Sequence, residues 1–288
     1  MTRHTRRGDD SVTSLARSPS AASILKAPPT PPGFTPPGRH RDRAQAKSAR
    51  ATLRLAKALT EKYGRQLRKI ARHIDDIVRG FDAGSEAGRR AIQAHLQRYS
   101  ATLAPWAEAN ADRMLAEVAA ADGKRWRRLS AEIGRGIERE IQSAPVADAF
   151  ARMKADQVRL ITSLPSEAAE RVHSLVVEGL SKGVRSDEIA AQIYETGSVS
   201  RSRADLIART EVSRAATTFQ MSRAQHVGSP GYIWRTSEDS DVRHDHRLLA
   251  GKVFRWDDPP VADRRTGAKA HPGCIYRCRC YAETLLPD

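Results

Sequence analysis

Cysteine, aromatic residues and long apolar segments are all scarce in this sequence of 288 residues. Three cysteines are too few for a disulfide framework, and an aromatic content of 5% is low for a large β-sandwich. No apolar run approaches the roughly 18 residues of a membrane span, and the basic N-terminus lacks the apolar core of a secretory signal. We therefore expect neither an integral membrane protein nor a secreted disulfide scaffold. The remaining composition favours a mainly helical protein.

Positive charge clearly exceeds negative charge. The chain carries 49 Lys and Arg against 34 Asp and Glu, which gives a formal net charge of +15. Residues 1–50 contain ten Lys or Arg against three Asp, a net of +7 within that stretch alone. This balance favours an anionic partner, either nucleic acid or an acidic protein surface.

The first 42 residues differ in composition from the rest. Residues 1–42 hold seven of the 15 prolines, and proline lacks the backbone N–H that helices and central strands need. We expect this stretch to be a disordered, basic, proline-rich arm. It is either a solvated tail or a flexible arm whose contacts with nucleic acid or a partner protein depend on salt.

Residues 43–200 are predicted to be helical. The proline-free stretch 43–104 places apolar residues three and four positions apart, as on one face of an amphipathic helix. These residues are Leu55, Leu59, Tyr63, Leu67, Ile70, Ile74, Ile77 and Phe81. Glycine and proline predict helix ends or starts at Gly80, Pro105, Pro145 and Pro165. The region shows no catalytic motif.

The last part of the chain, residues 201–288, begins with a long predicted helix over about 201–226. Beyond Gly228, strands are predicted at 232–236, 252–256 and 279–285, with a loop over 257–273. The predicted fold class is therefore mainly α. A helical N-terminal and middle region follows the disordered arm, and a small α+β module ends the chain.

Histidine and cysteine gather in this last part. His and Cys side chains at short spacing can close a tetrahedral zinc site, and the run from His271 has the spacing H-x2-C-x3-C-x-C. A zinc site is one hypothesis; a cluster of reduced structural thiols without metal, a catalytic thiol and a disulfide are the alternatives. The candidate ligands are His246, His271, Cys274, Cys278 and Cys280, with His244 as an alternative to His246.

A metal-dependent nuclease or toxin-like enzyme is an alternative reading of the same residues. It would use Asp241, His246 and His271, since an Asp near a His is a common acid–base pairing. No glycine-rich phosphate loop or nucleophile elbow accompanies them. We therefore predict a non-enzymatic protein with no catalytic residues.

Several separated blocks resemble the phage Mu F-like head morphogenesis family of minor capsid proteins. They are the tract ADLIARTEVSRAAT at 204–217, Trp234, D-x-R-x-x-H from Asp241, LLAGKVF at 248–254, HPG at 271–273 and CRC at 278–280. The resemblance covers roughly residues 160–285, although Cys274 and the residues IYR separate HPG from CRC by more than in the family. It implies motif positions with structural roles at Arg209, Thr210, Glu211, Trp234, Asp241, Arg243, His246, Gly251, Pro272 and Arg279.

The resemblance implies a role in head (procapsid) morphogenesis or DNA packaging. The implied partners are the portal protein, a scaffold or major capsid protein, and non-specific DNA, with no membrane. The implied location is the interior of the virion or procapsid, after synthesis in the bacterial host cytoplasm. A DNA-binding accessory protein without a capsid role remains a further alternative. On a helix, Glu211 would pair with Arg214 three residues later, or pack against Arg243 or Arg279 if buried.

Overall fold

The computed structural model describes residues 39–132 and 136–286. Most of the predicted arm, residues 1–38, lies outside the described residues, and residues 39–42 already belong to the first helix. The helices are α1 (Arg39–Arg79), α2 (Glu86–Thr102), α3 (Ala104–Glu132), α4 (Glu138–Ser143), α5 (Val146–Ser181), α6 (Ser186–Tyr194), α7 (Thr196–His226) and α8 (His244–Leu249). The strands are β1 (Gly231–Arg235), β2 (Val253–Arg255), β3 (Val261–Asp263), β4 (Ala268–Lys269) and β5 (Tyr281–Thr284). The predicted fold class, mainly α with a small C-terminal α+β module, is confirmed.

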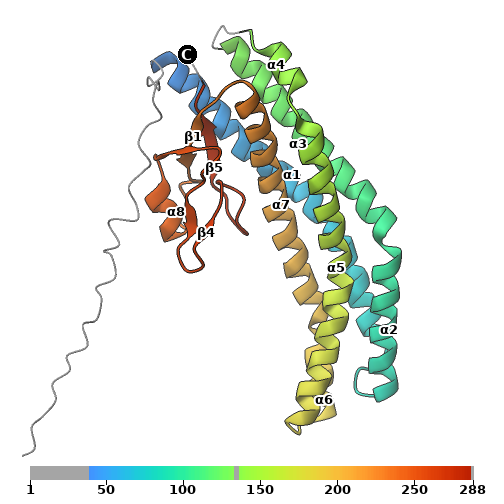
Figure 1. Ribbon diagram of the computed structural model, residues 1–288. Helices are drawn as coiled ribbons and strands as arrows, with labels where there is room; N and C mark the ends of the chain where they lie inside the picture. The colour runs from blue at the N-terminus through green and yellow to red at the C-terminus, as the bar shows by residue number, and fades with distance from the viewer. Residues whose placement is uncertain (1–38, 133–135, 287–288) are drawn as a thin grey trace, which may run out of the picture.

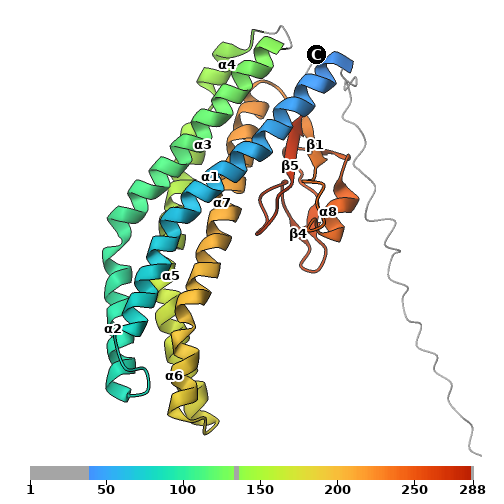
Figure 2. The ribbon, with the colours of Figure 1, turned by 180° about the vertical axis from the view of Figure 1, so that it is seen from behind.

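The helices form an elongated bundle (Figure 1). α1, α3, α5 and α7 run alongside one another, and α6 reverses the chain between α5 and α7 at the end shared with α2. Most of the apolar stripe of α1 faces inward as predicted, with Leu67, Ile70 and Ile74 fully buried, whereas Leu55 at its start is 36% exposed. Figure 2, which views the molecule from behind, shows α1 crossing the bundle next to α7. Burial of these stripes against neighbouring helices stabilises the bundle far more than helix propensity does.

The prediction that Pro165 starts a helix is wrong, because α5 continues through it. Proline removes one backbone hydrogen bond, a cost that packing on both sides offsets. Ile161, Leu164 and Val172 are buried before and after the proline. Ser100 of α2 also donates a hydrogen bond of 2.9 Å to the Thr162 carbonyl in the same turn.

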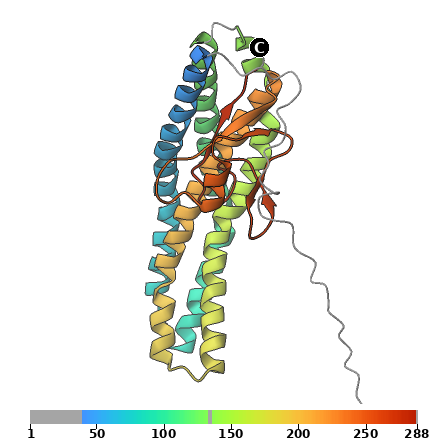
Figure 3. The same cartoon turned by 90° about the vertical axis from the view of Figure 1, so that its left-hand side faces the viewer.

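The C-terminal module packs beside α1 and α7 (Figure 3). Its antiparallel sheet has the order β2-β1-β5, and β3 pairs with β4 as a separate hairpin. The three strands predicted from the sequence correspond to β1, β2 and β5. The hairpin lies inside the segment 257–273, which the sequence predicts as a loop. Its strands are only three and two residues long, so they leave little alternating pattern to detect.

The core of the module is continuous with the helical region. Trp126 and Leu129 of α3 belong to the same buried cluster as Tyr232, Trp234 and Phe254. The module therefore relies on side chains more than a hundred positions earlier in the chain. Within the described residues, no helix has the length and apolar character needed to cross a bilayer.

Candidate metal centre in the C-terminal module

Three buried side chains meet in the module: His246 of α8 and Cys278 and Cys280 before β5. Each residue offers one potential ligand atom, and these three atoms all lie within 4.8 Å of one another. His246 Nδ1 lies 3.5 Å from Cys278 Sγ and 3.4 Å from Cys280 Sγ. The arrangement therefore presents one imidazole and two thiols, the ligand types that favour zinc.

Local structure explains why these three side chains converge. His244 and His246 are two positions apart on the helix α8, so they face different directions, and His244 is exposed whereas His246 is 2% exposed. Cys278 and Cys280 are also two positions apart, but in the non-helical segment leading into β5, where that spacing can bring both side chains to one side. The same spacing therefore separates the histidines and joins the cysteines.

The His246 ring is fixed by its surroundings. Its Nε2 lies 3.1 Å from the carbonyl oxygen of Ala262 in β3, so Nε2–H donates to that carbonyl. Nδ1 is then the nitrogen with the free lone pair, and it faces both sulfurs. The Trp234 ring packs edge-on against the imidazole, with 5.4 Å between ring centroids.

The sulfur of Cys278 accepts two backbone hydrogen bonds. The N–H groups of Gly273 and Cys280 donate to Cys278 Sγ at 3.4 Å each. The hydrogen bond from the Cys280 thiol lowers the pKa of Cys278 well below its ordinary value, against the opposing effect of burial. The same contact raises the pKa of Cys280.

The other two candidate ligands lie outside this group. His271 Nδ1 lies 3.0 Å from the Tyr232 hydroxyl, and the ring also packs against Trp256. Burial lowers the pKa of His271, which keeps the imidazole neutral. Burial raises the pKa of the Cys274 thiol to about 12, and its Sγ is not among the atoms that meet at His246.

The residues of the enzyme alternative have separate partners. Asp241 is exposed and accepts a hydrogen bond of 3.0 Å from Arg279. His246 belongs to the cysteine cluster, and His271 to the aromatic group around Tyr232. The structure thus assigns these three side chains to three different settings.

The remaining motif residues hold the module together. Thr210 of α7 accepts a hydrogen bond of 3.2 Å from the Arg277 N–H, and Arg243 stacks on Tyr276 at 4.6 Å. Gly251 takes the left-handed φ of +77° at the turn before β2. The Pro272 carbonyl accepts a hydrogen bond of 2.7 Å from the buried Thr217 hydroxyl, which attaches the HPG segment to α7.

Glu211 is buried within the helical bundle. Gln157 of α5 donates to its carboxylate at 2.6 Å, and Arg214 lies 3.3 Å away, as the spacing along the helix predicts. Arg243 and Arg279, the other partners considered, contact Tyr276 and Asp239 instead. Sequence patterns did not indicate Gln157, since nothing in the sequence pairs positions 157 and 211.

Two motif arginines line a cleft of about 390 Å³ between α1, α7 and the module. Arg209 comes from α7 and Arg279 from the segment before β5, and Arg54 and Lys57 of α1 complete the cationic lining. Glu61 and Asp239 are the acidic residues in the lining, so the cleft carries an excess of positive charge.

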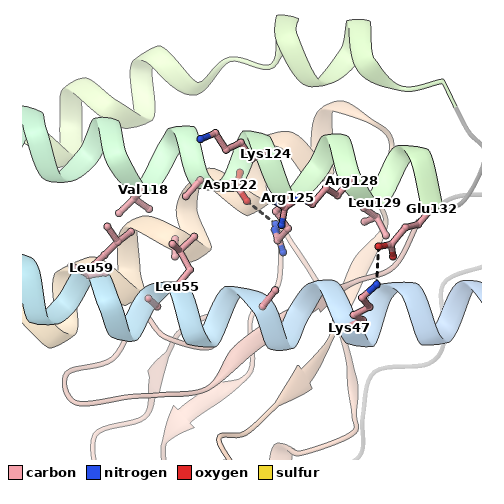
Figure 4. Close-up of a pocket in the computed structure, with 15 residues that line it drawn as sticks. Lys47, Leu55, Leu59, Val118, Asp122, Lys124, Arg125, Arg128, Leu129 and Glu132 are labelled. Carbon is pink, nitrogen blue, oxygen red and sulfur yellow. Dashed lines mark hydrogen bonds and ion pairs between the residues drawn. The ribbon is translucent and has the colours of Figure 1, made fainter.

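A second cavity, of about 360 Å³, lies between α1 and α3 over α7 (Figure 4). Lys47 and Glu132 form an ion pair of 3.2 Å at its edge. Asp122 of α3 is buried beside the cavity and binds both Arg125, at 2.6 Å, and Arg223 of α7. The apolar spacing of α3 gave no sign of this buried ionic contact.

The fold and the cluster define a helical-bundle protein with a small Cys/His-bearing C-terminal module. Residues 170–283 match the family model described as "Phage Mu protein F like protein", which confirms the resemblance seen in the sequence. No solved structure matches the chain.

Curated relatives cover parts of the chain. An uncharacterised protein of Haemophilus influenzae is 29% identical over 161 residues, or 56% of this chain and 35% of the relative. The minor head protein GP7 of Bacillus phage SPP1 is 26% identical over 125 residues, or 40% of this chain and 41% of the relative. An uncharacterised protein of Methanocaldococcus jannaschii is 28% identical over 42% of this chain and 18% of its own length. The chain therefore spans less than half the length of each of these relatives.

Proposed function

We propose that this protein is a minor head protein of a phage or prophage that acts in head morphogenesis. The observation that carries the proposal is the Mu F-like region at 170–283, which is reinforced by the similarity to a phage minor head protein. The protein would act inside the procapsid or virion after synthesis in the host cytoplasm. Its protein partners would be the portal protein and a scaffold or major capsid protein.

We propose further that the protein contacts packaged DNA without sequence specificity. The net charge of +15 and the cationic lining of the cleft between α1, α7 and the module support this step. Contacts to phosphate carry no sequence information, which suits a protein enclosed with a whole genome.

We also propose that the protein is structural and not an enzyme, and that its Cys/His cluster holds a structural zinc ion. The separate settings of Asp241, His246 and His271 support the first part of this proposal. The nuclease alternative predicts DNA degradation that depends on a divalent metal and that His246→Ala abolishes.

Mass spectrometry of particles from the induced host tests the head role, with procapsids and mature virions purified separately. Peptides of this chain in both particles would support a minor virion component, and peptides in procapsids alone would support an assembly factor. Absence from both particles, with abundant protein in the lysate, would contradict the head role. A deletion in the coding sequence should reduce the yield of filled heads in the same experiment.

A further inference from the structure

We propose that His246 Nδ1, Cys278 Sγ and Cys280 Sγ are three ligands of one zinc ion. This inference specifies the structural zinc proposed above and drops His271 and Cys274 from the ligand set. It does not depend on the head role, because the ligand atoms lie within one chain.

The distances between the ligand atoms match a tetrahedral zinc site. Zinc bonds of about 2.05 Å to nitrogen and about 2.3 Å to sulfur, at a tetrahedral angle, separate the two ligand atoms by about 3.5 Å. The two N···S distances in the structure are 3.5 and 3.4 Å. Both sulfurs therefore lie at the separation from Nδ1 that a shared zinc ion would impose.

Hydrogen bonding to Nδ1 alone does not explain why both sulfurs approach this nitrogen. The neutral imidazole has one lone pair, on Nδ1, and both sulfurs approach that nitrogen at similar distances. Only one S–H can donate to a single lone pair with good geometry. A cation between the three atoms instead accepts one lone pair from each of them.

The residues around the cluster orient the ligands as in known metal sites. Metal-binding histidines usually donate their second N–H to a carbonyl or carboxylate, and His246 Nε2 lies 3.1 Å from the Ala262 carbonyl. Two backbone N–H groups, of Gly273 and Cys280, point at Cys278 Sγ and would stabilise a thiolate there. Gly273 adopts the left-handed φ of +84° that this loop requires.

The ligand set selects among metals. Two thiolates and an imidazole suit zinc, whereas Mg²⁺ and Ca²⁺ prefer oxygen ligands. All three side chains are buried, with exposed fractions of 2% for His246, 3% for Cys278 and 6% for Cys280. Burial with three ligands from one chain indicates a resident ion that joins α8 to the segment before β5. The strands of this module have five residues at most, so such a link would add materially to its stability.

The test measures zinc in the purified full-length chain by elemental analysis. We expect about one zinc ion per chain in the wild type, and loss of most of it in the Cys278→Ser and Cys280→Ser variants. His244→Ala and Cys274→Ser are matched controls, because they change the same residue types nearby outside the ligand set, and both should keep the zinc. His246→Cys should also keep zinc, since a third thiolate replaces the imidazole.

Cobalt provides a second readout, because its absorption reports the type and geometry of the ligands directly. Wild-type chain stripped of zinc and titrated with Co²⁺ should develop thiolate-to-cobalt absorption and the visible bands of a tetrahedral site. His246→Cys should intensify the thiolate absorption, and Cys274→Ser should leave the spectrum unchanged.

Three outcomes overturn parts of the proposal and are distinguishable. Zinc that survives in Cys278→Ser, or disappears in Cys274→Ser, would overturn the ligand set while leaving a structural zinc in place. A wild-type chain that binds neither zinc nor cobalt would overturn both the ligand set and the structural zinc. Neither result bears on the head role, which the particle analysis tests separately.

Discussion

Gln157 of α5 donates a hydrogen bond of 2.6 Å to the buried carboxylate of Glu211 in α7. The Tyr63 hydroxyl of α1 donates in turn to Gln157 at 2.9 Å, so three helices share one polar chain inside the bundle. Burial is the largest influence on the Glu211 carboxyl and raises its pKa, against the opposing effect of Arg214. Glu211, in the motif tract 204–217, therefore has a structural role in the packing of these helices.

This raised pKa gives a prediction about stability and pH. The folded protein holds the Glu211 proton more tightly than the unfolded chain, in which the pKa is about 4.3. The carboxyl therefore contributes stability that is complete below about pH 4.3 and is lost as pH rises through the folded pKa. We expect the unfolding free energy of the wild type to fall relative to Glu211→Gln over this window, by at most about 1.4 kcal/mol per pH unit.

Urea denaturation of both proteins at several pH values from 4 upward measures the difference. Glu211→Gln keeps the shape and the acceptor for Gln157, so it isolates the effect of the charge. Gln157→Leu is a second variant, because it removes a hydrogen bond that lowers the pKa of Glu211 and should extend the pH dependence to higher pH. A wild type that gains stability relative to Glu211→Gln as pH rises would contradict the prediction.

The helical framework followed from apolar spacing because each long helix buries one continuous stripe. The stripe that begins at Leu55 predicted the second half of α1, since its period is visible over several turns, but Phe81 lies just beyond the end of the helix. The prediction at Pro165 was wrong because it considered only the local cost of proline within a helix. The burial of Leu164 and Val172 outweighs this cost, and that burial comes from other helices.

The candidate metal site was only partly predictable for a similar reason. Composition placed His246, Cys278 and Cys280 among five candidates, but spacing alone could not separate them from His271 and Cys274. The separation depends on α8 being helical and on His271 packing against Tyr232, both of which are tertiary facts. The buried partners Gln157 and Asp122 left no signal, because a single polar residue on a helix looks like surface.

The buried ion pair between Asp122 and Arg223 gives a second prediction. Asp122→Ala would leave the Arg223 guanidinium buried without its main partner, and breaking such a pair costs about 3–5 kcal/mol. We expect a loss of that size in chemical denaturation followed by circular dichroism. Lys47→Ala is the control, since the Lys47–Glu132 pair at the edge of the same cavity is exposed (Figure 4) and contributes below about 1 kcal/mol. Equal losses in the two variants would contradict the assignment of Asp122 as a buried structural charge.

The contact between Thr217 and the HPG segment gives a third prediction. Thr217→Val keeps the side-chain shape but leaves the Pro272 carbonyl without its buried donor, which costs about 1–3 kcal/mol. We expect faster amide hydrogen exchange in residues 271–278 as well as lower overall stability. Thr210→Val removes a more exposed contact on the same helix and should cost less. Unchanged exchange in that segment would show that the hydrogen bond does not hold it.

The cationic cleft gives a fourth prediction, which tests the proposed contact with DNA. Each phosphate contact adds about 0.9 to the slope of log affinity against log salt concentration. If Lys57 and Arg209 each contact a phosphate, the double change to alanine should weaken binding to duplex DNA and lower that slope by about 2.

The control must remove the same charge from a distant surface. Lys182 and Arg185 are exposed at the turn between α5 and α6, at the opposite end of the bundle from the module (Figure 1). Their double change to alanine lowers the net charge equally, so any effect of total charge appears in both variants. A loss of affinity that is larger for Lys57 and Arg209 would locate the contact at the cleft. Equal losses would mean that DNA senses only the overall charge, because a diffuse electrostatic attraction does not distinguish between the two sites.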